Sequence, residues 1–175
     1  MVPDGDEVIS RKGGYMKFNK GWEAVIVGVV MMGCLTLPVR AQPGGVPQPV
    51  FACSLGKKSV FVTAVGNQLI YKFGTPTNTE MSIIGSADRK NVLYRADRYA
   101  GMEYQLRFVN GPYSYIVYNM EGNGNTGARA VSGLLVMKDT KTVARMSCTR
   151  YAEFSANFDY SSLPEDSEDY SAMSN

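Results

Sequence analysis

Short β-rich runs alternate with turn signals from residue 50 to residue 148, and this spacing constrains the fold more than any other feature. Turn residues recur at roughly 8–12-residue intervals, as in antiparallel β proteins. Tyr, Phe, Val and Gly are plentiful, and long runs of strong helix formers are missing. We therefore predict an all-β fold, a single antiparallel meander closed as a small barrel or folded as a sandwich. The expected strands are Val50–Leu55, Val60–Val65, Gln68–Phe73, Glu80–Ile84, Val92–Arg95, a hairpin over Met102–Asn119, Val131–Met137 and Thr142–Cys148.

The central hairpin contains an Asn110-Gly111 pair, which suggests a two-residue type I′ turn. Pro112 would close that turn, and proline has no N–H to donate. A three-residue loop pairs Val109 with Tyr113, and a four-residue loop pairs Phe108 with Tyr113. We predict the four-residue loop because it separates apolar from polar side chains better. It places Leu106, Phe108, Tyr113, Tyr115 and Val117 on the core face, and Gln105, Arg107, Ser114, Ile116 and Tyr118 on an outward face where a partner could dock.

An apolar run near the N-terminus (AVIVGVVMMGCLTLPV) has the pattern of a secretory signal peptide. Lys17 and Lys20 precede it, and Val39-Arg40-Ala41 supplies small residues around a cleavage site. We predict a signal peptide over residues 16–41, cleaved near Ala41, and a periplasmic or secreted protein. The alternative is a membrane-spanning helix, but the run is shorter than the roughly 20 residues that a bilayer requires.

Two further expectations concern the same region. Met31-Met32-Gly33-Cys34 loosely resembles a lipobox, so lipidation at Cys34 is a second alternative and would anchor the protein to a membrane. Met16-Lys17 is a better start than Met1, and Lys12-Gly13-Gly14 is what a translated ribosome-binding site would encode. We expect translation from Met16 in a bacterium, with residues 1–15 untranslated or dispensable. Residues 42–49 (QPGGVPQP) are predicted to be an extended linker.

Removal of residues 1–41 leaves two cysteines, Cys53 and Cys148. An even pair in an exported protein predicts a disulfide. This bond would join the first strand of the β domain (residues 50–150) to the last strand, the two edges that a closing sheet must bring together.

Charge divides the mature sequence into a basic body and an acidic tail. Residues 42–150 hold 13 basic and 6 acidic residues, whereas residues 151–175 hold six acidic residues and no basic one. Tyr151, Phe154 and Phe158 follow the i, i+3, i+7 spacing of a helix face. Ser162-Leu163-Pro164-Glu165 has the form of a capping box for a second helix to about Met173. We predict a tail of short helices that folds back and neutralises the body.

Several function classes are excluded by composition. The chain has no histidine, so it lacks the base of Ser-His-Asp and Cys-His catalysis and the commonest metal ligand. The Gly- and Asn-rich loop 121–129 holds one carboxylate, whereas a calcium loop needs several. Export and the absence of a Lys/Arg run argue against a nucleic-acid partner. We predict a protein that is not an enzyme, with no metal and no cofactor.

Recognition of another macromolecule remains, and a protein of the cell envelope is the expected partner. Tyr and Arg are enriched among the residues that dominate the binding energy of protein–protein interfaces. Our candidate partner-binding residues are Arg129, Gly127, Arg107, Tyr118, Arg95, Arg98 and Tyr99.

Residues 50–148 resemble bacterial periplasmic inhibitors of C-type lysozyme in outline: an early Cys in a strand, a β meander, a Gly-rich loop with Arg, and a second Cys on the last strand. In that family a Ser-Gly-x-Lys/Arg-Tyr loop enters the lysozyme cleft. Thr126-Gly127-Ala128-Arg129-Ala130 matches this loop in part, with Thr for Ser and no Tyr.

The resemblance implies an exported inhibitor. The positive charge of the body would oppose binding to a basic lysozyme, and an immunity protein against a peptidoglycan-cutting toxin fits equally well. The alternative is a structural or envelope-associated β protein that binds glycan or lipid and has no enzyme target.

Overall fold

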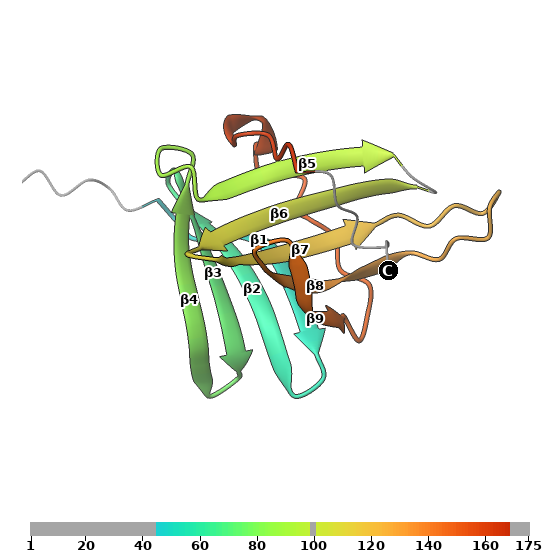
Figure 1. The fold of residues 1–175 in the computed structure, drawn as a ribbon, viewed down its shortest axis with the longest axis horizontal. Coiled ribbons are helices and arrows are strands. Elements are labelled where there is room, and N and C mark those ends of the chain that lie inside the picture. The colour runs from blue at the N-terminus through green and yellow to red at the C-terminus, as the bar shows by residue number, and fades with distance from the viewer. Residues whose placement is uncertain (1–44, 99–100, 169–175) are drawn as a thin grey trace, which may run out of the picture. The chain divides into compact units, whose positions relative to one another are not determined.

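The computed structural model describes residues 45–98 and 101–168, which belong to one compact unit built from two antiparallel β-sheets (Figure 1). The predicted signal peptide, the predicted start at Met16, Cys34 and residues 169–175 lie outside the described residues. The first sheet has the strands β1 (Gln48–Leu55), β2 (Lys58–Val65), β3 (Gln68–Thr75) and β4 (Asn78–Ser86) in that order. The second sheet has β5 (Val92–Arg98), β6 (Met102–Asn110), β7 (Tyr113–Met120), β8 (Val131–Lys138) and β9 (Lys141–Ser147) in that order.

The all-β fold is confirmed, and neighbours in each sheet are also neighbours in sequence. The predicted single meander is instead two meanders, because β4 and β5 belong to different sheets. The first strand begins at Gln48, two residues earlier than the sequence predicts. Of the two predicted architectures, the structure is the sandwich, because the two sheets are hydrogen-bonded separately and do not close into a barrel. Their strands run crosswise to one another (Figure 1), as in orthogonally packed sheets.

The core lies between the inner faces of the two sheets. Each sheet contributes alternate residues of its strands, as the period of two requires. The ring of Tyr71 on β3 joins the sheets, since its centroid lies 5.4 Å from that of Phe108 and 5.7 Å from that of Tyr115. Both partners belong to the central hairpin, which therefore forms one wall of the core as predicted.

The central hairpin turns through Gly111 and Pro112, because Asn110 pairs with Tyr113. The predicted four-residue loop is therefore wrong. Gly111 has a φ of +59°, which glycine adopts without strain, and this places the proline inside the turn, where its missing N–H costs nothing.

The assignment of the hairpin's residues to the two faces is still correct. The observed register differs from the predicted one by two residues, and a shift of two keeps each side chain on the same face. Phe108 pairs with Tyr115 and Leu106 with Val117, all on the core side. The prediction of an open docking face on the other side is wrong, because four of its five residues are buried and Ser114 is half-buried; the buried four are Gln105, Arg107, Ile116 and Tyr118. A second apolar cluster occupies that face, with the buried members Ile116, Tyr118, Leu135 and Met137.

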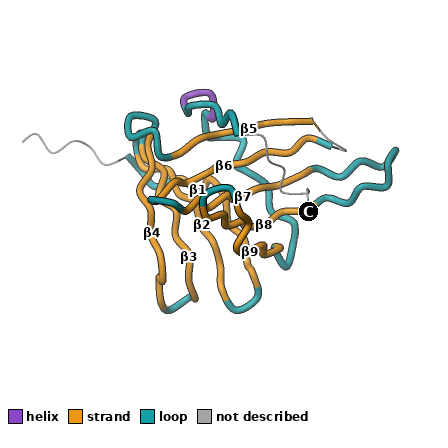
Figure 2. The backbone as a smooth tube through the Cα atoms, viewed as in Figure 1, coloured by secondary structure: helices purple, strands orange, loops and turns teal. Residues whose placement is uncertain are grey.

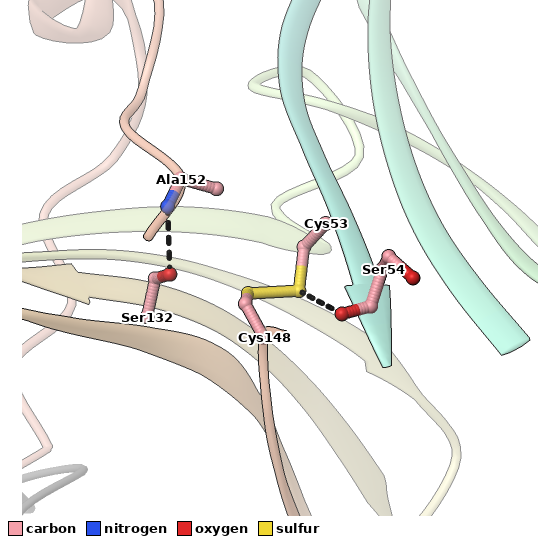
Figure 3. Close-up of a disulfide and its surroundings, with 5 residues drawn as sticks. All are labelled: Cys53, Ser54, Ser132, Cys148 and Ala152. Atoms are coloured by element: carbon pink, nitrogen blue, oxygen red, sulfur yellow. Dashed lines mark hydrogen bonds between the residues drawn. A yellow bond between two sulfur atoms is a disulfide. The ribbon is translucent and has the colours of Figure 1, made fainter. Parts of the chain in front are cut away.

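The predicted disulfide is present and joins Cys53 on β1 to Cys148, the residue that follows β9 (Figure 3). The two Cα atoms lie 5.5 Å apart. The backbone beyond the bond continues along the first strand, since the N–H of Thr149 donates to the carbonyl oxygen of Ser54 at 2.8 Å. The disulfide thus sets the point at which the C-terminal tail leaves the second sheet and meets the first.

The prediction of helices in the tail is wrong. Over residues 151–168, the described part of the tail, Figure 2 shows loop with a single short helical turn, a 3-10 helix over Tyr160–Ser162 that Asp159 caps. A helix of one or two turns is only marginally stable in water, and here the tail backbone bonds to strand edges instead. The predicted capping box begins in the last residue of this turn and continues as extended chain, because Leu163 has a φ of −93° and a ψ of 148°. No helix among the described residues is long and apolar enough to cross a bilayer.

We expect the loss of the disulfide to destabilise the fold strongly. The sequence separation of 95 residues predicts a contribution of about 4–5 kcal/mol on the chain-entropy model. The double variant Cys53→Ser/Cys148→Ser should therefore unfold at a markedly lower urea concentration than the oxidised protein. Wild-type protein reduced with a thiol is the matched control and should behave like the double variant. A loss below about 1 kcal/mol would show that the tail holds the two sheets without the bond.

Candidate functional site

The second sheet extends past the first at the end where β5 and β7 finish (Figure 1). We call this the projecting end. Its inward row consists of Tyr104, Asn119 and Ser132, which are register partners across β6, β7 and β8. The tail covers this row: the Nδ2 of Asn119 donates to the Tyr151 hydroxyl at 3.0 Å, and the N–H of Ala152 donates to the Oγ of Ser132 at 2.8 Å (Figure 3).

The tail then crosses from one sheet to the other and bonds to an edge strand of each. On β1 the N–H of Ser155 donates to the carbonyl oxygen of Val50 at 2.8 Å. On β5 the N–H of Tyr94 donates to the carbonyl oxygen of Pro164 at 2.9 Å, and the N–H of Asp166 donates to the carbonyl oxygen of Tyr94 at 2.8 Å. β1 and β5 are edge strands, so the tail satisfies backbone groups that would otherwise face solvent.

Aromatic rings of the tail fill the space between these two edges. Phe154 packs on Phe51 of β1 with ring centroids 4.9 Å apart, and Tyr160 stacks on Tyr94 of β5 at 5.0 Å. Phe158 meets the ring of Tyr160 edge-on at 4.9 Å. Burial raises the pKa of Tyr94 and that of Tyr160 above the ordinary tyrosine value. Both phenols therefore stay neutral in the folded protein at pH values where an exposed tyrosine ionises.

The acidic residues of the tail meet arginines of the second sheet. The Nη2 of Arg107 lies 2.6 Å from the Oδ1 of Asp166, and both side chains are more than nine-tenths buried. Arg107 also pairs with the carboxylate of Glu168, and Arg95 donates to the carbonyl oxygen of Glu168 and pairs with Asp97. The tail thus lies back on the basic body, as the charge asymmetry predicts, and neutralises part of it.

A half-open cavity of about 260 Å³ remains between the tail and the projecting end. Four aromatic side chains line it, those of Tyr94 and Tyr104 from the sheet and of Phe154 and Tyr160 from the tail. The remaining lining residues are Asn119, Glu121, Glu153, Ser155 and Ala156. Burial raises the pKa of Tyr151, and the negative charges of Glu153 and Glu121 raise it further, so both carboxylates act on this region.

The loop that follows β7 stands at the same end. Its start is held beside β6, because the N–H of Glu121 donates to the carbonyl oxygen of Met102 at 2.8 Å. A bridge closes its tip: the N–H of Asn123 donates to the carbonyl oxygen of Ala128 at 2.9 Å. Gly127 has a φ of +72°, and the next residue but one is the exposed Arg129. Arg129 therefore directly follows a segment, Asn123–Ala128, that the loop's own hydrogen bonds hold.

The predicted partner-binding residues fall into separate groups. Gly127, Arg129 and Arg98 lie at the projecting end, and Arg98 is exposed near the end of β5. Arg95 and Arg107 instead hold the tail.

Tyr118 has a structural role and Tyr99 lies outside the described residues. Tyr118 is 3 % exposed and lies over Gly133, where an added Cβ would come within 2.7 Å of its hydroxyl oxygen. Gly133 thus makes room for the buried phenol, which removes Tyr118 from the open surface.

Sequence reasoning missed the cavity and the residues that form it. The aromatic and acidic composition of the tail indicates that it packs on something, but no local pattern tells which strand edge receives it. Comparisons with protein-family models, with curated proteins and with solved structures found no match.

Replacement of Asp166 by Ala should destabilise the protein by about 3 kcal/mol, since it leaves the buried Arg107 with one carboxylate fewer. Glu165→Ala is the matched control, because Glu165 is exposed and its effect should stay within about 0.5 kcal/mol. Urea unfolding of the two variants measures both values. Equal midpoints for the two variants would contradict a stabilising role of the buried pair.

The tyrosines predict a loss of stability at alkaline pH. The pKa values of Tyr71, Tyr94 and Tyr160 are raised by burial, so the unfolded chain releases these protons first. The free energy of unfolding that these raised pKa values contribute is complete below about pH 10, the tyrosine pKa in the unfolded chain. It declines as the pH rises above that value. Urea midpoints measured on both sides of that pH should show the decline. The variant Tyr94→Phe/Tyr160→Phe should show a shallower decline, and an unchanged slope would contradict this assignment.

Proposed function

We propose that the protein is an exported, non-catalytic binding protein that acts as an inhibitor or immunity protein against a cell-wall hydrolase or toxin. The observation that supports this most is the loop of residues 121–130 with Arg129 exposed at its end. A loop whose conformation is already held by hydrogen bonds loses little entropy on binding, which favours affinity. Arginine is among the residues that most often dominate the energy of an interface.

Charge supports the same surface. Arg95 and Arg107 are occupied by the tail, whereas Arg98 and Arg129 have no ion-pair partner among the described residues. Arg98 and Arg129 therefore carry positive charge at the projecting end that the tail does not neutralise. A partner with an acidic face would be attracted to this end, and a basic enzyme would be repelled.

Two further points are compatible with export and with inhibition. The Cys53–Cys148 disulfide suits an oxidising compartment. The loop Thr126-Gly127-Ala128-Arg129 has the partial likeness to the inserting loop of lysozyme inhibitors described above. Because that likeness lacks the Tyr, we propose Arg129 alone as the residue that enters the target.

The variant Arg129→Ala should weaken inhibition by more than about 1 kcal/mol, which is at least about a fivefold rise in the inhibition constant. Lys57→Ala is the matched control, since Lys57 is exposed in the turn between β1 and β2, on the other sheet. The measurement is the rate at which envelope hydrolases clear a peptidoglycan suspension in the presence of each protein. Equal inhibition by both variants would exclude the loop mechanism.

The same assay separates the proposal from its alternative. If the wild-type protein inhibits no hydrolase or toxin and is retained instead by peptidoglycan or by lipid vesicles, the protein is an envelope-associated glycan or lipid binder.

A further inference from the structure

We propose that the cavity between the tail and the projecting end binds an organic cation, a guanidinium or ammonium group carried on an apolar stem. Arg129 does not line this cavity, so the proposal can be tested independently of the inhibitor function proposed above. Three features of the cavity support this ligand class: its aromatic walls, its uncompensated carboxylates and an unpartnered buried amide oxygen.

The walls suit a cation with an apolar stem. The rings of Tyr94, Tyr104, Phe154 and Tyr160 line the cavity, and two of them, Tyr94 and Tyr160, stack with centroids 5.0 Å apart. The face of an aromatic ring carries negative potential and attracts ammonium and guanidinium groups, most strongly where water is excluded. The same rings provide apolar surface for the methylene groups of a stem.

Asn119 adds a polar group that lacks a partner. Its side chain is 3 % exposed and lies in the cavity wall. Its Nδ2 donates to the hydroxyl of Tyr151, while its Oδ1 has no hydrogen-bond partner among the described residues. Buried acceptors are nearly always paired in native proteins. A ligand with N–H donors is of the kind that could supply the missing hydrogen bond to the Oδ1 of Asn119.

The charge of the cavity selects a cation over an anion or a neutral ligand. Glu121 and Glu153 both line it and are exposed, and neither forms an ion pair with a described residue. No lysine or arginine is among the described residues that line the cavity. Two carboxylates on one small cavity attract an organic cation and repel an anion.

The volume limits the ligand further. Sites for drug-sized ligands occupy about 300–1,000 Å³, and this cavity, of about 260 Å³, lies below that range. It therefore suits a small free amine or a single Lys or Arg side chain that another protein inserts. These two sources share the chemistry and differ in whether a peptide context adds affinity.

Calorimetric titration of the purified protein with agmatine tests the proposal, because agmatine carries a guanidinium group, an apolar stem and an ammonium group. We expect saturable binding that weakens as salt is added. 1-Pentanol and glutarate are the matched neutral and anionic probes, and each should bind at least about tenfold more weakly. In NMR spectra, agmatine should shift the side-chain amide resonances of Asn119.

The variant Glu121→Gln/Glu153→Gln should bind agmatine at least about tenfold more weakly. Both carboxylates are exposed, so the urea midpoint of this variant should match that of the wild type. Glu165→Gln is the control, since Glu165 is an exposed tail carboxylate outside the cavity lining, and its affinity should not change.

Unchanged agmatine affinity in the double variant would overturn the proposal. So would the absence of agmatine binding, equal binding of 1-pentanol, or tighter binding of a disaccharide of N-acetylglucosamine, which would indicate a glycan site. A short Arg-containing peptide then identifies the source of the cation. Affinity well above that of agmatine supports a side chain of a partner protein, and equal affinity supports a free amine.

Discussion

The tail is the element on which the two sheets depend, and the Cys53–Cys148 bond determines where it starts. Beyond the bond, the tail donates to Val50 on one edge strand and exchanges two hydrogen bonds with Tyr94 on the other. Two separate sheets would otherwise expose both of these edges, which are sites for unwanted pairing between chains. The disulfide brings the tail to the first edge, and the buried pair of Arg107 with Asp166 holds it at the second.

The strands of the protein could be predicted from sequence because each residue pattern that defines them is local. Alternation determines only which side of the sheet a residue faces, not how long the connecting loop is. In the central hairpin, the predicted pairing of Phe108 with Tyr113 and the observed pairing with Tyr115 differ by two residues. Both arrangements put Leu106 and Val117 on the same face, so the core wall was correct although the loop was wrong.

The tail and the cavity could not be predicted, because the groups that shape them are remote in sequence. The spacing of Tyr151, Phe154 and Phe158 fits a helix face, but an isolated helix of this length has little stability of its own. In an extended chain, the ring of Phe51 and the amide of Asn119 offer Phe154 and Tyr151 specific partners, and the carbonyl oxygen of Val50 accepts from the N–H of the neighbouring Ser155. Tertiary contacts therefore override the periodicity, and nothing near these residues in the sequence indicates that partnership.

The way the tail places its charges gives the projecting end two surfaces of opposite sign. Asp166 and Glu168 form ion pairs with Arg107 and neutralise its positive charge. Glu153, in contrast, lines the cavity together with Glu121. Arg129 stands only eight residues along the chain from Glu121, at the end of the same loop. A single partner that offers both a basic side chain and an acidic face would engage both surfaces at once. Two linked contacts of modest strength would then bind far more tightly than either alone.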